Sequence, residues 1–365
     1  MIKLTRQDLI DILYGATILG TGGGGSLSDG IKKIDEALNL NKEFILVDFD
    51  ELEDDDLIAT PYSCGAISPL TEEEIKKYEG LPVTEEASHV IALREMEKYL
   101  GKEVKAVIST ELGGGNTAIA FYSGAMAGKY IVDADPAGRS VPELQHSTYY
   151  LNNVSIHPMS LVNKFGESVI ITNVVNDFRA ESLVRALAVV SQNSIAVVDH
   201  VEPTKTLKKA VIRGAITNAL KIGRAYRTAK ENNEDISEKI ADSGKGKVIF
   251  KGCIFSNDWD TLEGFTVGTL TIKGSGEYNN DEFKVWYKNE NIITWRNGKY
   301  DAVVPDLICI FNEDEKEPLL NPYGKEGMKV SVIVLPAPKE WTTEKGLKTF
   351  GPGHFGHDID WKPYI

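Results

Sequence analysis

The sequence Glu-Leu-Gly-Gly-Gly-Asn at residues 111–116, followed by Asp-Ala-Asp-Pro-Ala-Gly-Arg-Ser-Val-Pro-Glu at residues 133–143, decides the fold. Each of these polar turns follows a short strand-like run, at residues 104–108 and 130–132, and an apolar helix-like segment separates them. In an open α/β sheet, polar turns that follow strands meet at the carboxyl edge and build sites there. We therefore expect an N-terminal α/β domain with both turns on one edge of its sheet.

The acidic side chains of the two turns are candidates for catalysis and metal binding. Carboxylates after glycine-bearing turns can act as general acids, general bases or metal ligands. We predict catalytic roles for Glu111, Asp135 and Glu143, and metal ligation by Asp133 and Asp135. Two structural alternatives stay open: the aspartates can cap the turn through side-chain hydrogen bonds to the backbone. Glu143, which follows a proline, can stand at a helix start where the helix dipole favours a carboxylate.

The remaining polar groups of these turns are candidates for substrate binding. Arg139 can hold a planar, oxygen-bearing molecule through its guanidinium fork, and Asn116 can donate or accept a hydrogen bond. Residues 20–26 read Gly-Thr-Gly-Gly-Gly-Gly-Ser between two predicted helices. The amides of Gly22, Gly23 and Gly24 are candidate donors to a substrate, because glycines allow close approach of the backbone. A tight connection between two packed helices explains the same glycines equally well.

Nucleotide binding by the glycine loop is the third interpretation. The dinucleotide fingerprint requires a strand before its glycines, and here a helix over residues 5–19 precedes them. A Gly-Lys-Ser/Thr sequence does not follow, which excludes a Walker loop.

Composition indicates an ordinary soluble globular protein with two domains. The chain has 365 residues, of which 42% are hydrophobic and 26% charged. A formal net charge of −14 argues against a nucleic-acid partner. No apolar run approaches the roughly 20 residues of a membrane span, and the N-terminus lacks the apolar core of a signal peptide. Three widely spaced cysteines predict no disulfide framework, so we expect a cytoplasmic protein with reduced thiols.

The N-terminal domain is expected over residues 1–165. Its further predicted elements are helices at 5–19, 29–38, 72–78 and 85–100 and strands at 44–48 and 57–60, read from apolar periodicity. Cys64 stands at the end of the second of these strands. There it is either a half-buried, inert residue or a nucleophile or ligand.

The second domain, over residues 166–365, is expected to be α+β. It should open with a strand at 168–174 and contain helices within about 177–228, with a long helix over 204–228. From about 245 to 340 the pattern alternates as in strands, and Asn-Gly and similar turns separate the runs. We expect a β-rich module of five or six strands there.

The sequence does not decide between structural and metal-binding roles for the histidines. His146 and His157 have no partner at the spacing of a helical zinc motif, so each is expected to be a packed or surface residue. The tail at 349–358 is rich in glycine and aromatic residues. His354 and His357, with Asp358 beside them, are either metal ligands or part of an aromatic cover over the domain boundary.

The order of these motifs resembles the S-methyl thiohydantoin desulfurase family over nearly the whole chain. The motifs that carry the resemblance are Gly20–Gly25, residues 111–116 and 133–143, Gly264–Gly268, Asn289-Glu290, residues 305–308 and residues 351–356. The family pattern has an arginine and a tyrosine near the last glycines, where this chain has His354 and His357. Family members often accompany proteins similar to hydantoinases and oxoprolinases.

The resemblance implies hydrolysis at a five-membered cyclic amide or amidine. In the named activity, water replaces the methylthio group of an S-methyl thiohydantoin and gives a hydantoin and methanethiol. The chemistry needs an activated water, a stabiliser for negative charge on the ring and a proton donor for the thiolate. A divalent metal, for which zinc is the first candidate, would supply the water at neutral pH.

Two other functions compete with an enzyme that acts on this small-molecule substrate. The chain could be a non-catalytic subunit of a hydantoinase- or oxoprolinase-like enzyme, which would lack metal but form a stable complex. It could also be a nucleotide-binding regulator that uses the glycine loop. We further expect a homo-oligomer.

Overall fold

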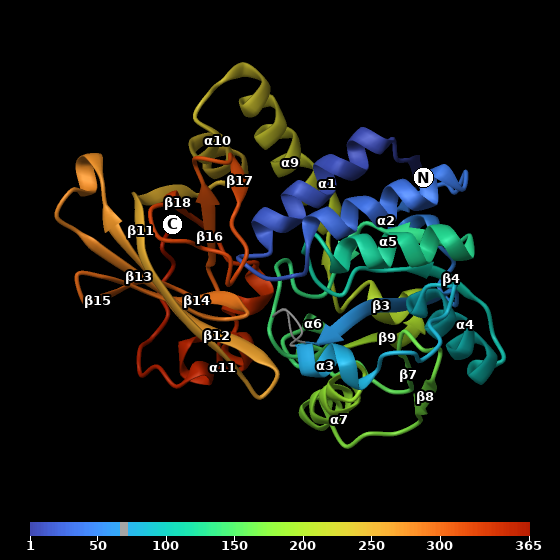
Figure 1. Cartoon of the computed structure of the whole chain (residues 1–365). Helices are drawn as coiled ribbons and strands as arrows, with labels where there is room; N and C mark the ends of the chain where they lie inside the picture. Colours follow the sequence, from blue (N-terminus) through green and yellow to red (C-terminus); the bar gives the residue numbers. More distant parts are fainter. Residues whose placement is uncertain (66–71) are drawn as a thin grey trace.

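The computed structural model describes residues 1–65 and 72–365 and contains two lobes, each built on one large β-sheet (Figure 1). The first lobe, blue to green in Figure 1, has a mixed sheet with helices on both faces. The second lobe, orange to red, has an antiparallel sheet. The predicted fold class is therefore confirmed: an α/β N-terminal domain precedes a C-terminal domain that contains an antiparallel module of eight strands.

The first sheet has the strand order β1-β2-β5-β4-β3-β9-β7-β8 among the described residues. The four adjacent strands β2, β5, β4 and β3 pair in parallel. The other pairs, β1 with β2, β3 with β9, β9 with β7 and β7 with β8, are antiparallel. The strands are β1 (Ile2–Lys3), β2 (Ile45–Val47), β3 (Leu57–Gly65), β4 (Val104–Val107), β5 (Tyr130–Val132), β7 (Met159–Val162), β8 (Ser168–Ile171) and β9 (Ser194–Pro203); β6 (Ala134–Asp135) and β10 (Ile212–Arg213) form a separate small ladder.

Different helices cover the two faces of this sheet, because successive side chains of a strand point to opposite faces. Val107 packs in the cluster with α1, α2, α4 and α5, whereas Ala106 and Ile108 pack on the other face with α6 and α8. Helix α7 packs against the β3–β9 end of the sheet. The helices are α1 (Arg6–Leu19), α2 (Leu27–Asn39), α3 (Glu72–Lys77), α4 (Ser88–Leu100), α5 (Asn116–Ala127), α6 (Thr148–Leu151), α7 (Asp177–Val189), α8 (Thr204–Leu207) and α9 (Ala215–Asn232), with the short η1 (Phe49–Glu51).

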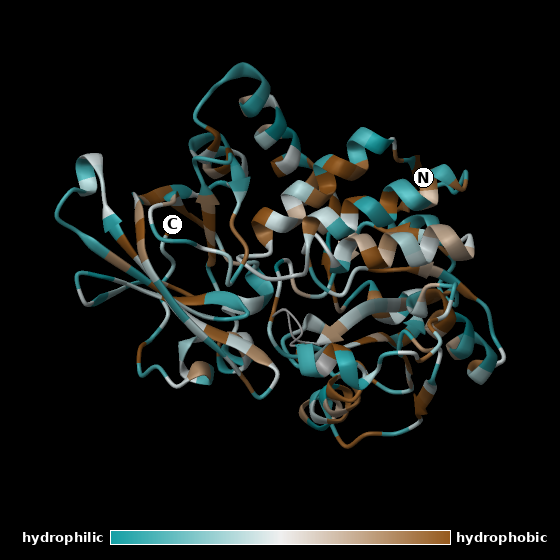
Figure 2. Ribbon diagram, viewed as in Figure 1, coloured by the Kyte–Doolittle hydropathy of each residue, from teal (hydrophilic) through white to brown (hydrophobic). Residues whose placement is uncertain are grey.

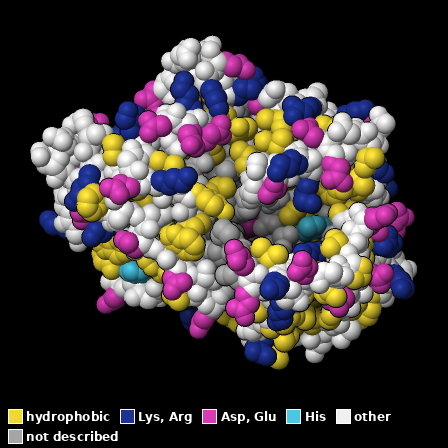
Figure 3. Space-filling view, viewed as in Figure 1, with side chains coloured by type: hydrophobic (Ala, Val, Ile, Leu, Met, Phe, Trp, Pro, Cys, Tyr) yellow, Lys and Arg dark blue, Asp and Glu magenta, His cyan; other side chains and the backbone are white. Residues whose placement is uncertain are grey.

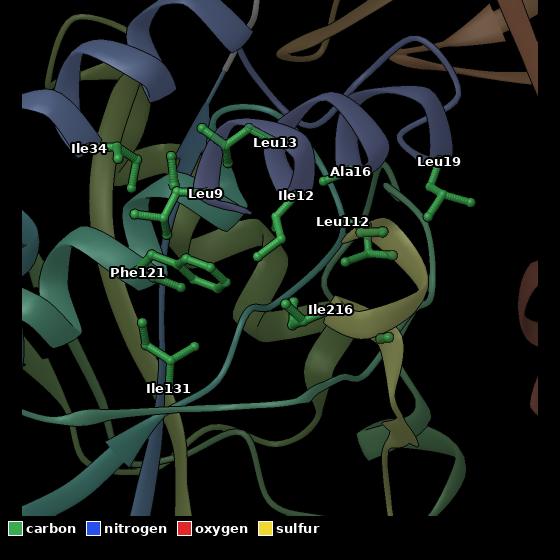
Figure 4. Packing of buried hydrophobic residues seen from close by; sticks show 14 of the residues in the cluster. Leu9, Ile12, Leu13, Ala16, Leu19, Ile34, Leu112, Phe121, Ile131 and Ile216 are labelled. Carbon is green, nitrogen blue, oxygen red and sulfur yellow. The ribbon is translucent and has the colours of Figure 1, made fainter. Parts of the chain in front are cut away.

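Helix α1 forms the centre of the first lobe's core. Thr5 caps it in a reciprocal capping box with Asp8, at the start of the helix predicted over residues 5–19. Leu9 and Ile12 of α1 are fully buried and lie in one cluster with Phe121 of α5 and Ile216 of α9 (Figure 4). Burial of each large apolar side chain contributes roughly 1.5–3 kcal/mol. This core therefore fixes the helical layer that carries the glycine loop.

The second sheet has the order β15-β14-β13-β12-β11-β18-β16-β17. Hydrophobic residues lie along its inner strands, and hydrophilic residues mark the hairpin ends (Figure 2). Its elements are β11 (Lys247–Leu262), β12 (Phe265–Gly274), β13 (Glu282–Lys288), β14 (Glu290–Arg296), β15 (Lys299–Val303), β16 (Leu307–Asn312), β17 (Glu317–Pro318) and β18 (Lys329–Leu335), with α10 (Ile236–Gly244), α11 (Glu344–Phe350), η2 (Gly276–Tyr278), η3 (Lys339–Thr342) and η4 (Pro352–Phe355).

Two expectations for the second half of the chain were wrong. The helix predicted over 204–228 is broken into α8, the short strand β10 and α9. The break lies at Gly214, whose φ of 75° is left-handed and whose N–H donates to the Asp133 carbonyl at 2.8 Å. The β-rich module has eight strands rather than five or six, because β17 has only two residues and short turns separate β14, β15 and β16.

The first sheet also receives strands from beyond residue 165, where we predicted the domain boundary. β8 and β9 complete it, and β9 lies between β3 and β7. Helix α9 likewise packs along α1 of the first lobe. The chain therefore crosses to the second sheet only near residue 245. Of the described helices, none has the length and apolar character of a membrane span.

The contact of α1 with α9 depends on two glycines. A Cβ at Gly223 would lie 1.7 Å from the Asp11 carbonyl oxygen, and one at Gly15 would lie 1.8 Å from the Ala219 oxygen. We expect Gly223→Ala to lower the free energy of unfolding by about 1–3 kcal/mol, because the helices must move apart. Urea denaturation measures this. Gly353→Ala is the control, since nothing lies within 4 Å of its added Cβ; equal stability of both variants would contradict the prediction.

Candidate functional site

A cavity of about 730 Å³ lies between the two lobes, and the face in Figure 3 is hollowed there. Segments of both lobes form its wall: residues 22–30, 62–65, 110–119, 141–149, 193–200, 289–290 and 320–323. The lining includes six of the residues that the sequence predicts for the site: Gly22, Gly23, Gly24, Glu111, Asn116 and Glu143. Asp133, Asp135 and Arg139 are not among the lining residues.

The glycine loop is both a tight connection and a part of the cavity wall. A Cβ at Gly23 would lie 1.8 Å from Oε1 of Glu290, and one at Gly24 would lie 2.5 Å from the Cα of Gly113. The Gly22 carbonyl accepts a hydrogen bond from the Asn321 amide at 2.8 Å. Glycine is required here because segments of both lobes approach the loop backbone.

Glu111 joins the two polar turns. Its Oε1 accepts a hydrogen bond from the Asn116 side-chain amide at 2.7 Å, and its Oε2 accepts one from the Val141 backbone at 2.9 Å. Asn116 also accepts a bond from the Ser63 amide at 3.0 Å. Burial raises the pKa of Glu111, and these hydrogen bonds oppose the shift. The two turns therefore do meet at one edge of the sheet.

Arg139 lies away from the cavity and links the two lobes. The side chain is fully buried, and its guanidinium donates to the carbonyls of Pro305 and Asp306 at 3.2 and 3.1 Å. It also donates to the Thr21 hydroxyl at 2.8 Å and stacks over the Phe350 ring at 4.8 Å. Burial lowers its pKa to about 10, which leaves it cationic at neutral pH. Its donors already have protein acceptors, so the geometry favours a structural role over substrate binding.

Asp133 and Asp135 have protein partners of their own. The carboxylate of Asp133 accepts hydrogen bonds from the Thr217 amide at 2.9 Å and hydroxyl at 2.5 Å at the start of α9. Oδ1 of Asp135 accepts bonds from the amides of Ala137 and Gly138, the turn-capping arrangement. Burial raises the pKa of Asp135 to about 7. No described group beside them completes a metal site, so their metal ligation stays a prediction.

Among the described residues, one group of side chains has the composition and spacing of a metal centre: Glu143, His146 and His354. The Oε2 of Glu143 lies 3.4 Å from Nε2 of His354 and 3.9 Å from Nε2 of His146, and the two Nε2 atoms are 3.0 Å apart. The cluster joins the second polar turn to the C-terminal tail. His146 is fully buried, and burial lowers its pKa to about 3, so its ring is neutral.

These three donors fit a divalent metal. Two imidazole nitrogens and one carboxylate oxygen are a common catalytic zinc set, and ligand atoms about 2.0–2.1 Å from a tetrahedral ion stand roughly 3.4 Å apart. The other oxygen of Glu143 pairs with Lys288 of the second lobe. Burial raises the pKa of Glu143, but the hydrogen bond from His354 and the cation of Lys288 outweigh this effect and lower the pKa. The carboxylate is therefore ionised, as a ligand must be.

Glu290 is a second buried carboxyl group beside Glu111. Its Oε1 accepts a hydrogen bond from the Ser140 hydroxyl at 3.1 Å, and its Oε2 has no partner among the described residues. Burial, reinforced by the charge of Glu111, raises the pKa of Glu290 to about 8. At neutral pH this side chain is a neutral acid that can donate a hydrogen bond.

Cys64 also lines the cavity, where it is buried and reduced. Burial raises the pKa of its thiol to about 12, so it carries no thiolate at neutral pH. The geometry therefore favours the inert interpretation of this cysteine. His357, the other open histidine of the tail, packs between Trp286, Trp295 and Tyr300 outside the cavity.

Our sequence reasoning missed several residues of the wall. The sequence predicts a packed or surface residue at His146, although its position three residues after Glu143 is a spacing at which two side chains of one turn can converge. The turn that contains Glu290 carries part of the family resemblance, but the sequence predicts no role in the site for this carboxyl group. Asp199 and His200 follow an apolar run that is typical of a buried strand. This position could have indicated a site, because burying a polar side chain costs free energy unless it is hydrogen-bonded.

The raised pKa of Glu290 gives a pH-dependent stability. The unfolded chain releases this proton near pH 4.5, while the folded chain holds it until about pH 8. The contribution of Glu290 to wild-type stability therefore falls between these values, and Glu290→Gln removes that loss. We expect the stability of the variant relative to wild type to rise with pH from 5 to 8, on the order of 1 kcal/mol per unit.

Urea denaturation at several pH values tests this expectation. The exposed Glu326→Gln is the control and should run parallel to wild type. A difference between Glu290→Gln and wild type that stays constant with pH would show that Glu290 is ionised in the folded state.

Comparisons with known proteins agree with this architecture. A crystal structure of a protein from Chromobacterium violaceum superposes with a TM-score of 0.78, at 22% identity over 100% of both chains. No curated protein matches the chain. Two family models match: the N-terminal domain of the S-Me-THD-like family over residues 7–173, and its C-terminal domain over residues 175–364. The chain therefore belongs to the S-Me-THD-like family.

Proposed function

We propose that this protein is a hydrolase of a five-membered cyclic amide or amidine, and that an S-methyl thiohydantoin is its substrate type. Water would replace the methylthio group, giving a hydantoin and methanethiol. The family membership supports the substrate class. The volume of about 730 Å³ falls in the range of small-molecule sites and leaves room for a substituted ring.

The observation that carries the proposal is the convergence of Glu143, His146 and His354, of which Glu143 and His146 line the cavity. A divalent metal held by these three side chains would supply a water that ionises near neutral pH. Lys288 keeps the Glu143 carboxylate ionised and oriented through the ion pair on its second oxygen. The buried His146 ring is neutral at this pH, so one of its two nitrogens carries the lone pair that a metal ligand needs.

Glu290, a neutral acid, would supply the hydrogen-bond donor that stabilises negative charge on the ring. Negative charge develops on the ring nitrogen or oxygen when water adds, and a preorganised donor in a water-poor site stabilises that charge. Oε2 of Glu290 has no described partner, so its proton is available to the ring. Glu111 and Asn116 fix the adjacent turn rather than offer free donors. Removal of such a donor lowers kcat by about 10²–10³-fold.

Glu143→Gln tests the centre of the site. We expect metal affinity to fall by at least about 10–100-fold, because losing a ligand should cost more than losing a group that only hydrogen-bonds to a ligand. Methanethiol release from a model S-methyl thiohydantoin should fall with it. Elemental analysis of metal per chain and thiol detection measure the two effects. His357→Gln, on the same tail but outside the cavity, is the matched control and should keep both.

Asp133→Asn separates the two candidate ligand sets. Asparagine keeps an acceptor for the Thr217 amide, so the fold should persist. Metal retained in Asp133→Asn and lost in Glu143→Gln supports the cluster named here, and the reverse pattern moves the centre to Asp133. Metal-loaded wild type without turnover of any cyclic amide would refute the proposed activity.

A further inference from the structure

Strand β9 contains a local irregularity where it faces the cavity. Ile58 of β3 pairs with Glu202, whereas Thr60 pairs with Asp199, so two residues of β9 stand opposite the single residue between them. His200 is one of these two, and its φ of 42° is left-handed. Such bulges re-aim side chains and occur next to active sites, and a left-handed histidine persists only where its surroundings hold it.

The imidazole of His200 is held by a carboxylate. Its Nδ1 lies 2.8 Å from Oδ1 of Asp199, and the second oxygen of Asp199 accepts a hydrogen bond from the Tyr62 hydroxyl at 2.7 Å. Both members of the pair are almost fully buried. A carboxylate on Nδ1 selects the tautomer with the proton on that nitrogen, which leaves a lone pair on Nε2.

His200 is one of the residues that line the cavity, and its second ring nitrogen, Nε2, is buried and has no hydrogen-bond partner among the described residues. One face of the ring stacks on Tyr149, with centroids 4.3 Å apart, and both side chains line the cavity. Tyr149 is itself fixed to Thr60 by a hydrogen bond of 3.3 Å. A buried ring nitrogen that is held in one orientation and has no hydrogen-bond partner is typical of a general base, which accepts a proton from a bound ligand.

We propose that Asp199 and His200 form a proton-transfer dyad that acts on the substrate of this cavity, an inference that rests on the proposed function. Nε2 of His200 takes a proton from the attacking water as the carbon–oxygen bond forms. The same proton passes to sulfur as the carbon–sulfur bond breaks, so methanethiol leaves neutral and His200 is regenerated. The ring keeps the hydroxyl oxygen and becomes the hydantoin. Asp199 stabilises the transient imidazolium and is a positioning residue.

This role is separate from that of the Glu143 cluster. The cluster lies on the second polar turn and the C-terminal tail, whereas the dyad lies on β9 and takes its support from β3 and α6. Loss of the dyad should therefore reduce proton transfer while leaving metal content unchanged. The distinction allows an experiment with two independent readouts.

His200→Gly is the main variant, because glycine accepts the left-handed backbone and leaves space for added imidazole. We expect kcat for methanethiol release to fall by about 10²–10⁴-fold, the usual contribution of acid–base catalysis. Added imidazole should restore part of the rate in this variant. Asp199→Asn, which keeps the shape but favours the wrong tautomer, should also lose at least about 10²-fold. Both should keep wild-type metal content. His157→Gly, outside the cavity, is the control and should lose no activity and gain none from imidazole.

The outcomes separate the two proposals. A wild type that turns over the substrate while His200→Gly keeps its full rate overturns the dyad and leaves the hydrolase intact. A metal-loaded wild type without turnover overturns the hydrolase and the proton transfer with it. Nitrogen-15 NMR of labelled histidine gives a test that needs no turnover. A proton found on Nε2 rather than Nδ1 of His200 overturns the dyad, even if His200→Gly fails to fold.

Discussion

The geometry of the cavity depends on one buried cation. The guanidinium of Arg139 lies at the junction of the lobes, where it donates to Thr21 of the glycine loop and to the Pro305 and Asp306 carbonyls of the second sheet. A buried guanidinium is tolerated only where its donors are paired, and here the acceptors come from both lobes, so the side chain joins them. Their fixed position in turn holds Glu290 against the glycine loop.

Much of the first lobe could be predicted because its signals are local. Thr5 and the apolar spacing after it define α1, and polar turns after two short parallel strands had to share an edge of the sheet. That edge does bring Glu111 and Glu143 to the cavity. Helix α1 depends on interactions between residues close in sequence, and the shared edge depends on a general property of parallel sheets. Both features could therefore be predicted from this sequence alone.

The rest depends on contacts between distant segments. His146 and His354 are 208 positions apart, and no periodicity in either segment encodes their meeting. The shifted pairing at His200 arises between two strands of the finished sheet, so the strand pattern of β9 alone does not reveal it. Asp133 and Arg139 have the residue types of ligands, and only the folded chain shows their partners: Thr217 at the start of α9 for Asp133, and carbonyls of the second lobe for Arg139. Residue type at a strand end predicted the place of a site better than the role of each residue.

The position of β9 has a consequence for dissecting the chain. The sequence of this family divides into two halves at residue 174, but β9 lies after that point and in the middle of the first sheet. A fragment that ended there would expose the edge of β3 and leave the β7–β8 hairpin without its neighbour. Such unpaired strand edges favour aggregation. The two halves are thus interlocked by one strand, and gene fission at the family boundary would separate β9 from both of its neighbours in the sheet.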